Sequence, residues 1–325
     1  MAIANNLMNQ APSFLAIAIP TFNRANDLRL CLESVAAAVE CYSHPHEINV
    51  VVSNNASTDF TVDILTDFQA RCKTFSFRWW TNPVNMGAVA NFKLLIAGSR
   101  AEYTLILTDD DLLLPKAVNL LVSMLKDEKP DFLKASILTY LCKSQKSFFY
   151  GLTSYQYSSI KDSFALVLYA IYYAHVFSAC VVKSDHIALS SIKSSTNCYP
   201  AMQLAALSHG SISFLCEPII LHVHENDNFW EKDVDITTDQ AKRRQLSADS
   251  LNAFYELTGS ITGRHQIIEL LVFTILKYGK IPPGSAKLLP LYRLLGVFLV
   301  AYPSFFLRKF IEFARLSARL ILSLR

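Results

Sequence analysis

The sequence predicts an α/β fold, in which a mostly parallel sheet is followed by amphipathic C-terminal helices. Three observations support this prediction. Apolar runs of strand length alternate with helical patterns over the first part of the chain, the order that builds parallel β-α-β units. Polar turns follow several of these runs. From residue 266 onward the sequence becomes apolar and basic, which is typical of a separate helical region.

The first element is an uninterrupted apolar run that ends at a proline, which suits a buried first strand. Asn26 or Asp27 is expected to cap the helix that follows. Later segments also have the composition of strands. The expected strands are Phe14–Ile19, Ile48–Val52, Phe75–Trp80, the run ending at Asp109–Asp111, Phe132–Leu141, His175–Lys183 and Glu217–Asp227. Further helices are expected at Thr61–Gln69, Val89–Ala97 and Lys116–Leu125.

The segment Leu105–Asp111 carries the clearest chemical signal, because an apolar run leads directly into three carboxylates. Unpaired buried carboxylates cost several kcal/mol each, so these acids must face water, a cation or a cation-bound ligand. The alternative is that Asp110 or Asp111 caps the helix that Pro115 indicates.

Polar segments also follow two earlier strands, at Thr21–Arg24 and Asn54–Asp59. The carboxyl ends of parallel strands meet at one edge of a sheet, where open α/β folds bind ligands. We therefore expect these two segments to converge with Asp109–Asp111 on one cleft.

The motifs resemble those of family 2 glycosyltransferases, over about residues 14–225. They are Ile19-Pro-Thr-Phe-Asn-Arg24, Ser53-Asn-Asn-Ala-Ser-Thr-Asp59, Asn82-Pro-Val-Asn-Met-Gly87 with Asn91, and Leu107-Thr-Asp-Asp-Asp111. Such enzymes have the GT-A fold, a Rossmann-like sheet, and transfer a sugar from a nucleotide-sugar. Within the family the sequence looks like transferases of bacterial O-antigen and surface polysaccharides, such as abequosyltransferase-like and rhamnosyltransferase-like enzymes.

The resemblance implies roles for residues at the matching positions. Asp111, as the main metal ligand and a catalytic residue, and Asp109 would hold Mg²⁺ or Mn²⁺, which stabilises the leaving diphosphate as a Lewis acid. A His after the last strand also contacts the metal or diphosphate in some relatives; His224 matches it better than His222, with a buried structural histidine as the alternative. The expected donor-binding residues are Pro20, Thr21, Asn23, Arg24, Asn54, Asp59, Gly87, Asn91, Asp109 and Asp110.

Two departures from the family pattern stand out. Asn54 occupies the place of a common Asp, and its amide could face a cytosine edge, which suggests a CDP-sugar donor; alternatively Asn54 only maintains a turn. The family's usual base carboxylate is missing, since Ser190–Cys216 holds no acid. Asp227 is the base we select, with Glu225 and Asp185 as other options, and a retaining reaction would also fit.

Charge and cysteine content narrow the partner classes. The last 39 residues carry a net charge of +6 and the rest of the chain −3, which argues against nucleic acid and for a local anionic partner. Seven scattered cysteines without a CxxC pair indicate reduced thiols rather than zinc. No signal peptide is expected at the N-terminus.

The expected organisation is an N-terminal extension (1–13), a catalytic domain (14–227), a polar lid or linker (228–265) and a basic helical region (266–325). Basic and apolar residues alternate in Phe310–Leu324, as in helices that lie on anionic leaflets. We expect peripheral attachment to the cytoplasmic face of a bacterial inner membrane and an undecaprenyl-type lipid-linked glycan acceptor. A packed hairpin or an oligomer contact is the alternative for the tail, and a nucleotidyltransferase or a non-catalytic binding protein for the function.

Overall fold

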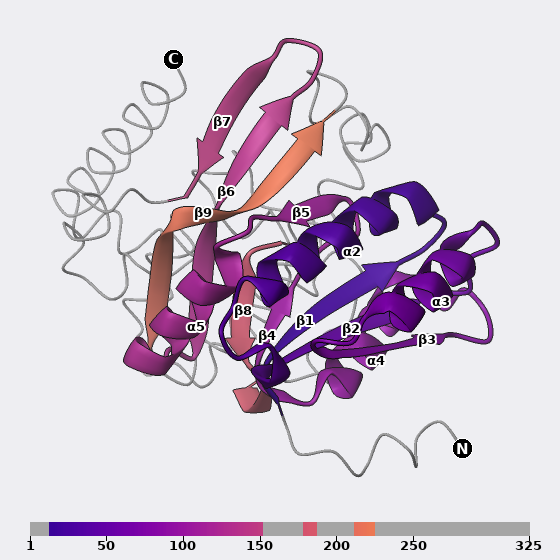
Figure 1. Ribbon diagram of the computed structural model, residues 1–325, viewed down its shortest axis with the longest axis horizontal. Coiled ribbons are helices and arrows are strands. Elements are labelled where there is room, and N and C mark those ends of the chain that lie inside the picture. Colours follow the sequence, from indigo (N-terminus) through magenta and orange to yellow (C-terminus); the bar gives the residue numbers. More distant parts are fainter. Residues whose placement is uncertain (1–12, 152–177, 187–210, 225–325) are drawn as a thin grey trace, which may run out of the picture.

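The computed structural model describes residues 13–151, 178–186 and 211–224. In this part of the chain the strands form one nine-stranded sheet with the order β3-β2-β1-β4-β8-β6-β9-β5, and β7 pairs with β6 at its side (Figure 1). The strands are β1 (Ser13–Thr21), β2 (Ile48–Asn54), β3 (Ser76–Thr81), β4 (Ala101–Ile106), β5 (Asp111–Leu113), β6 (Phe132–Leu141), β7 (Lys146–Tyr150), β8 (Cys180–Lys183) and β9 (Ile212–His224).

The N-terminal half of the sheet is parallel, as expected. Strand β1 pairs in parallel with β2 and β4, and β2 pairs in parallel with β3. The connections are the helices α2 (Ala25–Glu40), α3 (Thr61–Arg71) and α4 (Gly87–Ser99), because parallel neighbours need a crossover. All four of these strands therefore end at the same edge of the sheet.

The other half corrects the prediction of a mostly parallel sheet, because the sheet as a whole is mixed. Strand β8 runs antiparallel to both β4 and β6, β7 is antiparallel to β6, and β5 is antiparallel to β9; only the pair β6 and β9 is parallel. The sequence-based expectation extended the β-α-β pattern beyond its last crossover helix. Antiparallel strands need no such helix, so the later segments could not show their direction by periodicity.

Helices cover both faces of the parallel half. Side chains alternate across a strand, so Leu15, Ile17 and Ile19 of β1 belong to the large core formed with α2, α3 and α5 (Ala117–Glu128). Ala18 points to the opposite face and packs with Leu95 of α4. This two-sided burial explains the continuous apolar runs that identified the strands.

Two helix starts differ from the prediction. Helix α2 begins at Ala25, so Asn26 and Asp27 lie inside its first turn rather than at the cap. Helix α5 follows Lys116 and has no side-chain cap, so neither Asp110 nor Asp111 caps it. The acids also lie further from the strand than expected, since β4 ends at Ile106.

Several predicted segments lie outside the described residues. They are the lid or linker 228–265, the amphipathic region 266–325 and the N-terminal part of the expected strand at 175–183. In the described part of the chain, no helix is long and apolar enough to cross a membrane.

Candidate active site

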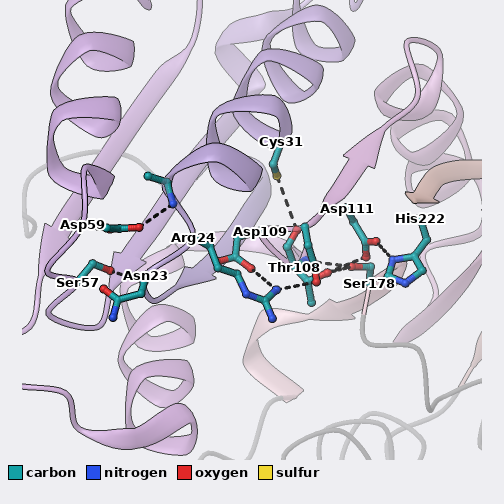
Figure 2. Close-up of polar contacts among 12 residues, drawn as sticks. Asn23, Arg24, Cys31, Ser57, Asp59, Thr108, Asp109, Asp111, Ser178 and His222 are labelled. Carbon is teal, nitrogen blue, oxygen red and sulfur yellow. Dashed lines mark hydrogen bonds and ion pairs between the residues drawn. The ribbon is translucent and has the colours of Figure 1, made fainter. Parts of the chain in front are cut away.

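The candidate site is built where the parallel strands end. The register places Thr21 of β1 beside Asn54 of β2, and Asn54 beside Thr81 of β3. The Leu107 amide continues the pairing of β4 with β1 by donating to the Ala18 carbonyl at 3.0 Å. The convergence expected from the sequence is confirmed: Figure 2 shows side chains from these exits in one row that runs from Asp59 through Arg24 to His222.

The acidic segment is fixed by contacts on both sides. The Thr108 backbone amide donates to the Ser178 hydroxyl at 2.9 Å, and the Thr108 hydroxyl donates to Asp111 Oδ2 at 2.7 Å. The Asp111 backbone amide donates to the Thr108 carbonyl at 3.2 Å, and this hydrogen bond closes a turn. On the helix side, the Ser34 hydroxyl of α2 accepts from the Leu113 amide at 2.9 Å. The three carboxylates are thus held on a rigid segment.

Arg24 connects the first strand exit to the acids. Its Nη1 donates to Asp109 Oδ1 at 3.2 Å and to Asp110 Oδ2 at 2.6 Å. Burial raises the pKa of Asp109 to about 7, although Arg24 opposes this change. Burial also acts on Asp110, but there the Arg24 guanidinium and a hydrogen bond from Thr108 outweigh it and lower the pKa. Asp110 is the more exposed of the two carboxylates.

Asp111 lies deeper and is paired with a histidine. Its Oδ1 contacts Nδ1 of His222, because β5 and β9 place these two residues opposite each other. Burial lowers the pKa of His222, but the hydrogen bond and charge of Asp111 outweigh burial and raise it. An imidazole beside a carboxylate suits a divalent cation or a phosphate oxygen.

The sequence favours His224 over His222 as a ligand, and among the described side chains His222 is the histidine that contacts the acids. The signal that identifies it is the strand register of β5 and β9, which is not visible in the sequence. The backbone of His224 ends β9, and its side chain lies outside the described residues, as does Asp227.

The base candidate Asp185 is excluded by topology. It follows β8, which runs antiparallel to β4 with Lys183 opposite Tyr103. The short helix with Asp185 therefore lies at the edge where β4 begins, opposite the edge that carries the three acids. Asp185 is close in sequence to the acid-free segment Ser190–Cys216, but the direction of β8 carries it to the other edge of the sheet.

Asn54, one of the expected donor-binding residues, makes its contacts inside the protein. It is fully buried, its Nδ2 donates to the Thr81 hydroxyl at 3.0 Å, and its Oδ1 accepts from the Ser57 amide at 3.0 Å. Because both the nitrogen and the oxygen of its side-chain amide are engaged, Asn54 maintains the turn after β2. The contacts give no support to recognition of cytosine by this amide.

Asp59 and Asn91 also have structural partners. Asp59 accepts from the backbone amide of Ala25 at 3.0 Å and from that of Thr61 at 3.1 Å, so one carboxylate caps the starts of α2 and α3. The buried Asn91 accepts from the Ser53 hydroxyl at 2.6 Å and from Nδ2 of Asn82 at 2.9 Å.

The amide groups of Asn55, Asn82 and Asn85 extend this hydrogen-bonded network to the loop before α4. There Gly87 adopts a left-handed φ of +78°, and its N–H donates to Asn85 Oδ1 at 2.9 Å. These hydrogen bonds connect the ends of β2 and β3 to the start of α4.

Thr21 and Phe22 lie in the first exit, just before Asn23 and Arg24. Thr21 is buried, and its Oγ1, which lies close enough to Asp109 to lower the pKa of that carboxyl, makes no regular hydrogen bond within the described residues. The next residue, Phe22, is 40% exposed. Pro20 lies in β1, paired with Ser53. The exposed Phe22 ring was not among the predicted donor-binding residues, although an aromatic residue in a polar turn is itself a signal.

The side chains around the acids fit a divalent cation for which the protein supplies only part of the coordination shell. Among the described residues, no three His, Cys, Asp or Glu side chains form a ready-made cage. Mg²⁺ is usually held by one or two carboxylates, with water and substrate phosphates completing its shell. Asp109 and Asp111 meet that requirement, with His222 in contact with Asp111 and the Thr21 hydroxyl close to Asp109.

Comparison with known proteins agrees with this fold. Residues 16–172 match the family model described as Glycosyl transferase family 2, and no curated protein matches the sequence significantly. The fold is similar to S. aureus TarS 1-349 in complex with UDP-GlcNAc, with 13% identity, a TM-score of 0.57 and coverage of 81% of this chain and 72% of that one. It is also similar to the mannosyltransferase PcManGT from Pyrobaculum calidifontis in complex with GDP-Man and Mn²⁺, with 12% identity, a TM-score of 0.51 and coverage of 93% and 92%.

Proposed function

We propose that this chain, whose residues 16–172 match the glycosyltransferase family 2 model, is a GT-A enzyme that transfers a sugar from a nucleotide-sugar to a lipid-linked glycan. The observation that carries the donor half is the row of side chains across the strand exits, in which Arg24 reaches two of the three acids and His222 contacts the third. Such a site offers both cationic and metal-binding groups to a diphosphate.

The chain's residues have distinct tasks in this proposal. Asp111 and Asp109 would hold Mg²⁺ or Mn²⁺, which supplies Lewis-acid stabilisation of the leaving diphosphate. His222 keeps Asp111 oriented, and Arg24 brings a second positive charge. The 40% exposed Phe22 ring offers a face on which a nucleobase can stack.

For the sugar donor we propose a chemical class, the nucleotide-sugars, rather than one compound. Because the Asn54 amide is bonded within the protein, we include nucleotide-sugars of any base rather than CDP-deoxysugars alone. TarS and PcManGT, in complex with UDP-GlcNAc and GDP-Man respectively, support a nucleotide-sugar of some kind.

The acceptor half of the proposal is supported by the sequence. Seven basic residues and one acid in the last 39 positions, interleaved with apolar side chains, suit contact with an anionic leaflet. We therefore propose that the reaction takes place at the cytoplasmic surface of a bacterial inner membrane, on an undecaprenyl-type acceptor in O-antigen or other surface-polysaccharide synthesis. Abequosyl and rhamnosyl transfer are the specific reactions that the motifs suggest.

A thermal-shift panel tests the donor half. The full chain is heated with UDP, GDP, CDP or dTDP, and with the matching sugar nucleotides, each with Mn²⁺ or with EDTA. A ligand present at 100 times its Kd stabilises by about 2.7 kcal/mol, which corresponds to a rise in Tm of about 5 °C or more for a domain of this size. At least one nucleotide should give such a rise only with Mn²⁺. No rise with any nucleotide would contradict the proposal.

Vesicle flotation tests the membrane half. The full chain should float with vesicles containing phosphatidylglycerol and stay unbound with pure phosphatidylcholine. Equal behaviour with both lipids would contradict an electrostatic membrane contact.

A further inference from the structure

Arg24 is held in place by the backbone that precedes it. Asn23 has a left-handed φ of +52°, which asparagine tolerates better than most residues. The backbone amide of Asn23 donates to the Ser57 hydroxyl at 2.9 Å, and its side-chain Oδ1 accepts from the Thr58 backbone amide at 2.8 Å. The first exit is thus attached to the second, and α2 starts directly after Arg24. The backbone of Arg24 is therefore held in place while its guanidinium contacts the acids.

The contacts of the guanidinium use only part of it. A single nitrogen, Nη1, serves both Asp109 and Asp110. Within the described residues, Nε and Nη2 have no hydrogen-bond or ion-pair partner, and the side chain is 47% exposed. Three N–H donors of the planar fork are therefore open to solvent beside the acids. This open edge has the geometry that binds a phosphate in a bidentate manner.

The acids need a positive neighbour when no ligand is bound. Three carboxylates in sequence repel one another, and Asp109 is almost fully buried, so its charged form depends on a partner. Arg24 is that partner for Asp109 and Asp110, as His222 is for Asp111. A divalent cation that binds either oxygen of the Asp109 carboxylate lies next to the guanidinium that contacts its Oδ1, and two positive groups so close together repel each other.

We propose that Arg24 is an internal counter-ion that holds back the divalent cation until a diphosphate arrives. The diphosphate then draws the guanidinium away from Asp109 through its open edge, and the cation takes the freed carboxylate. Cation and nucleotide consequently bind with positive coupling, and the coupling is reciprocal. This inference rests on the proposed function, because it assigns an order to binding at the same site.

The test is the effect of Arg24→Gln on two separate affinities of the full-length protein. Mn²⁺ alone is titrated and the free ion is followed by electron paramagnetic resonance. The nucleoside diphosphate that most stabilises the wild-type protein in the panel above is then titrated calorimetrically with saturating Mn²⁺. Arg24→Gln should bind Mn²⁺ alone about five- to tenfold more tightly, as expected for loss of a nearby, partly exposed competing charge, and should bind the nucleotide more weakly.

The opposite signs separate this role from a structural one, since a damaged site would lose both affinities. Arg24→Lys keeps the charge and should restore most of the wild-type suppression of Mn²⁺ binding. Arg71→Gln is the matched control: Arg71 also bridges two carboxylates, Glu33 at 2.7 Å and Asp67 at 2.9 Å, on an exposed part of α3. This control should leave both affinities unchanged.

Unchanged or weaker Mn²⁺ binding by Arg24→Gln would overturn the inference, as would an equal gain in Arg71→Gln. The proposed function fails separately, if the wild-type protein binds no nucleoside diphosphate with or without Mn²⁺. A wild-type protein that binds Mn²⁺ only with nucleotide, beside an Arg24→Gln variant that binds Mn²⁺ alone, would be the strongest support.

Discussion

Replacing Asp59 with alanine tests whether one carboxylate organises two strand exits. Asp59 Oδ2 accepts from the first amide of α2, and Oδ1 accepts from the amide and the hydroxyl of Thr61, the first residue of α3. Loss of an N-cap acceptor typically costs about 1 kcal/mol. Asp59→Ala removes the acceptor of two helices, so we expect a loss of about 2 kcal/mol in the free energy of unfolding. Asp59→Asn, which keeps an acceptor, should lose about half of that.

The effect of Asp59 should depend on pH in a defined direction. Burial raises the pKa of Asp59, but the hydrogen bonds from Thr61 and the Ala25 amide outweigh burial and lower it. The folded state therefore binds its proton less readily than the unfolded state does. The stability that Asp59 supplies is complete above the unfolded-state pKa of about 4 and is lost as the pH falls through the folded-state pKa. The difference between wild type and Asp59→Ala should shrink below about pH 4.

Urea denaturation followed by far-UV circular dichroism, at pH 7 and at pH 3.5, measures both effects. Asp63→Ala is the matched control, because Asp63 is an exposed acid in the first turn of the same helix α3. It removes the same charge near the helix N-terminus and should cost about 0.5 kcal/mol. The reasoning is refuted if Asp59→Ala costs no more than Asp63→Ala, or if its cost grows as the pH falls.

Three further predictions concern packing, the polar network and the ligand. In Gly98→Ala, the new Cβ would lie 2.6 Å from Cη2 of Trp80, so we expect a net loss of about 1 kcal/mol despite the better helix propensity of alanine; a higher Tm in thermal denaturation would contradict this. Asn91→Ala leaves the buried Ser53 and Asn82 groups without their shared acceptor and should cost about 2 kcal/mol in urea denaturation, whereas the exposed Asn85→Ala should cost under about 1 kcal/mol; equal costs would count against the network. Phe22→Ala should weaken nucleoside diphosphate binding about tenfold in calorimetry if a base stacks on this ring, while Phe22→Tyr should bind normally; an unchanged affinity for the alanine variant would exclude stacking.

The parallel half of the fold was predictable because burial on both faces leaves continuous apolar runs, and three crossover helices connect the four runs in that half. The runs at Phe14–Ile19 and Ile48–Val52 correspond to β1 and β2 with only their ends shifted. Strand direction in the other half was not predictable. β8 and β9 are apolar segments, and an apolar pattern carries no information about which neighbour a strand joins or in which direction it runs.

The candidate site was predictable to the level of its segments and less so in the roles of its residues. The acids and Arg24 were found because charges that follow a buried strand need partners. The contact of His222 with Asp111 was not predicted, because it depends on the register between β5 and β9. Asn54, Asp59 and Asn91 were assigned to the donor from their motifs, whereas their observed hydrogen bonds are made within the protein. Asn and Asp side chains satisfy loop backbones as readily as ligands, and only coordinates separate the two uses.

Release of nucleoside diphosphate from a sugar nucleotide, with and without Mn²⁺, tests the central assignment most directly. The wild-type chain should release diphosphate from the donor selected by the thermal-shift panel, and EDTA should stop the reaction. Asp111→Asn, which keeps the size of the side chain next to His222 but removes its charge, should lower the rate on the order of a hundredfold or more, while Asp63→Asn should match the wild type. An Asp111→Asn variant that remains fully active, or a wild-type rate that is indifferent to EDTA, would contradict the account.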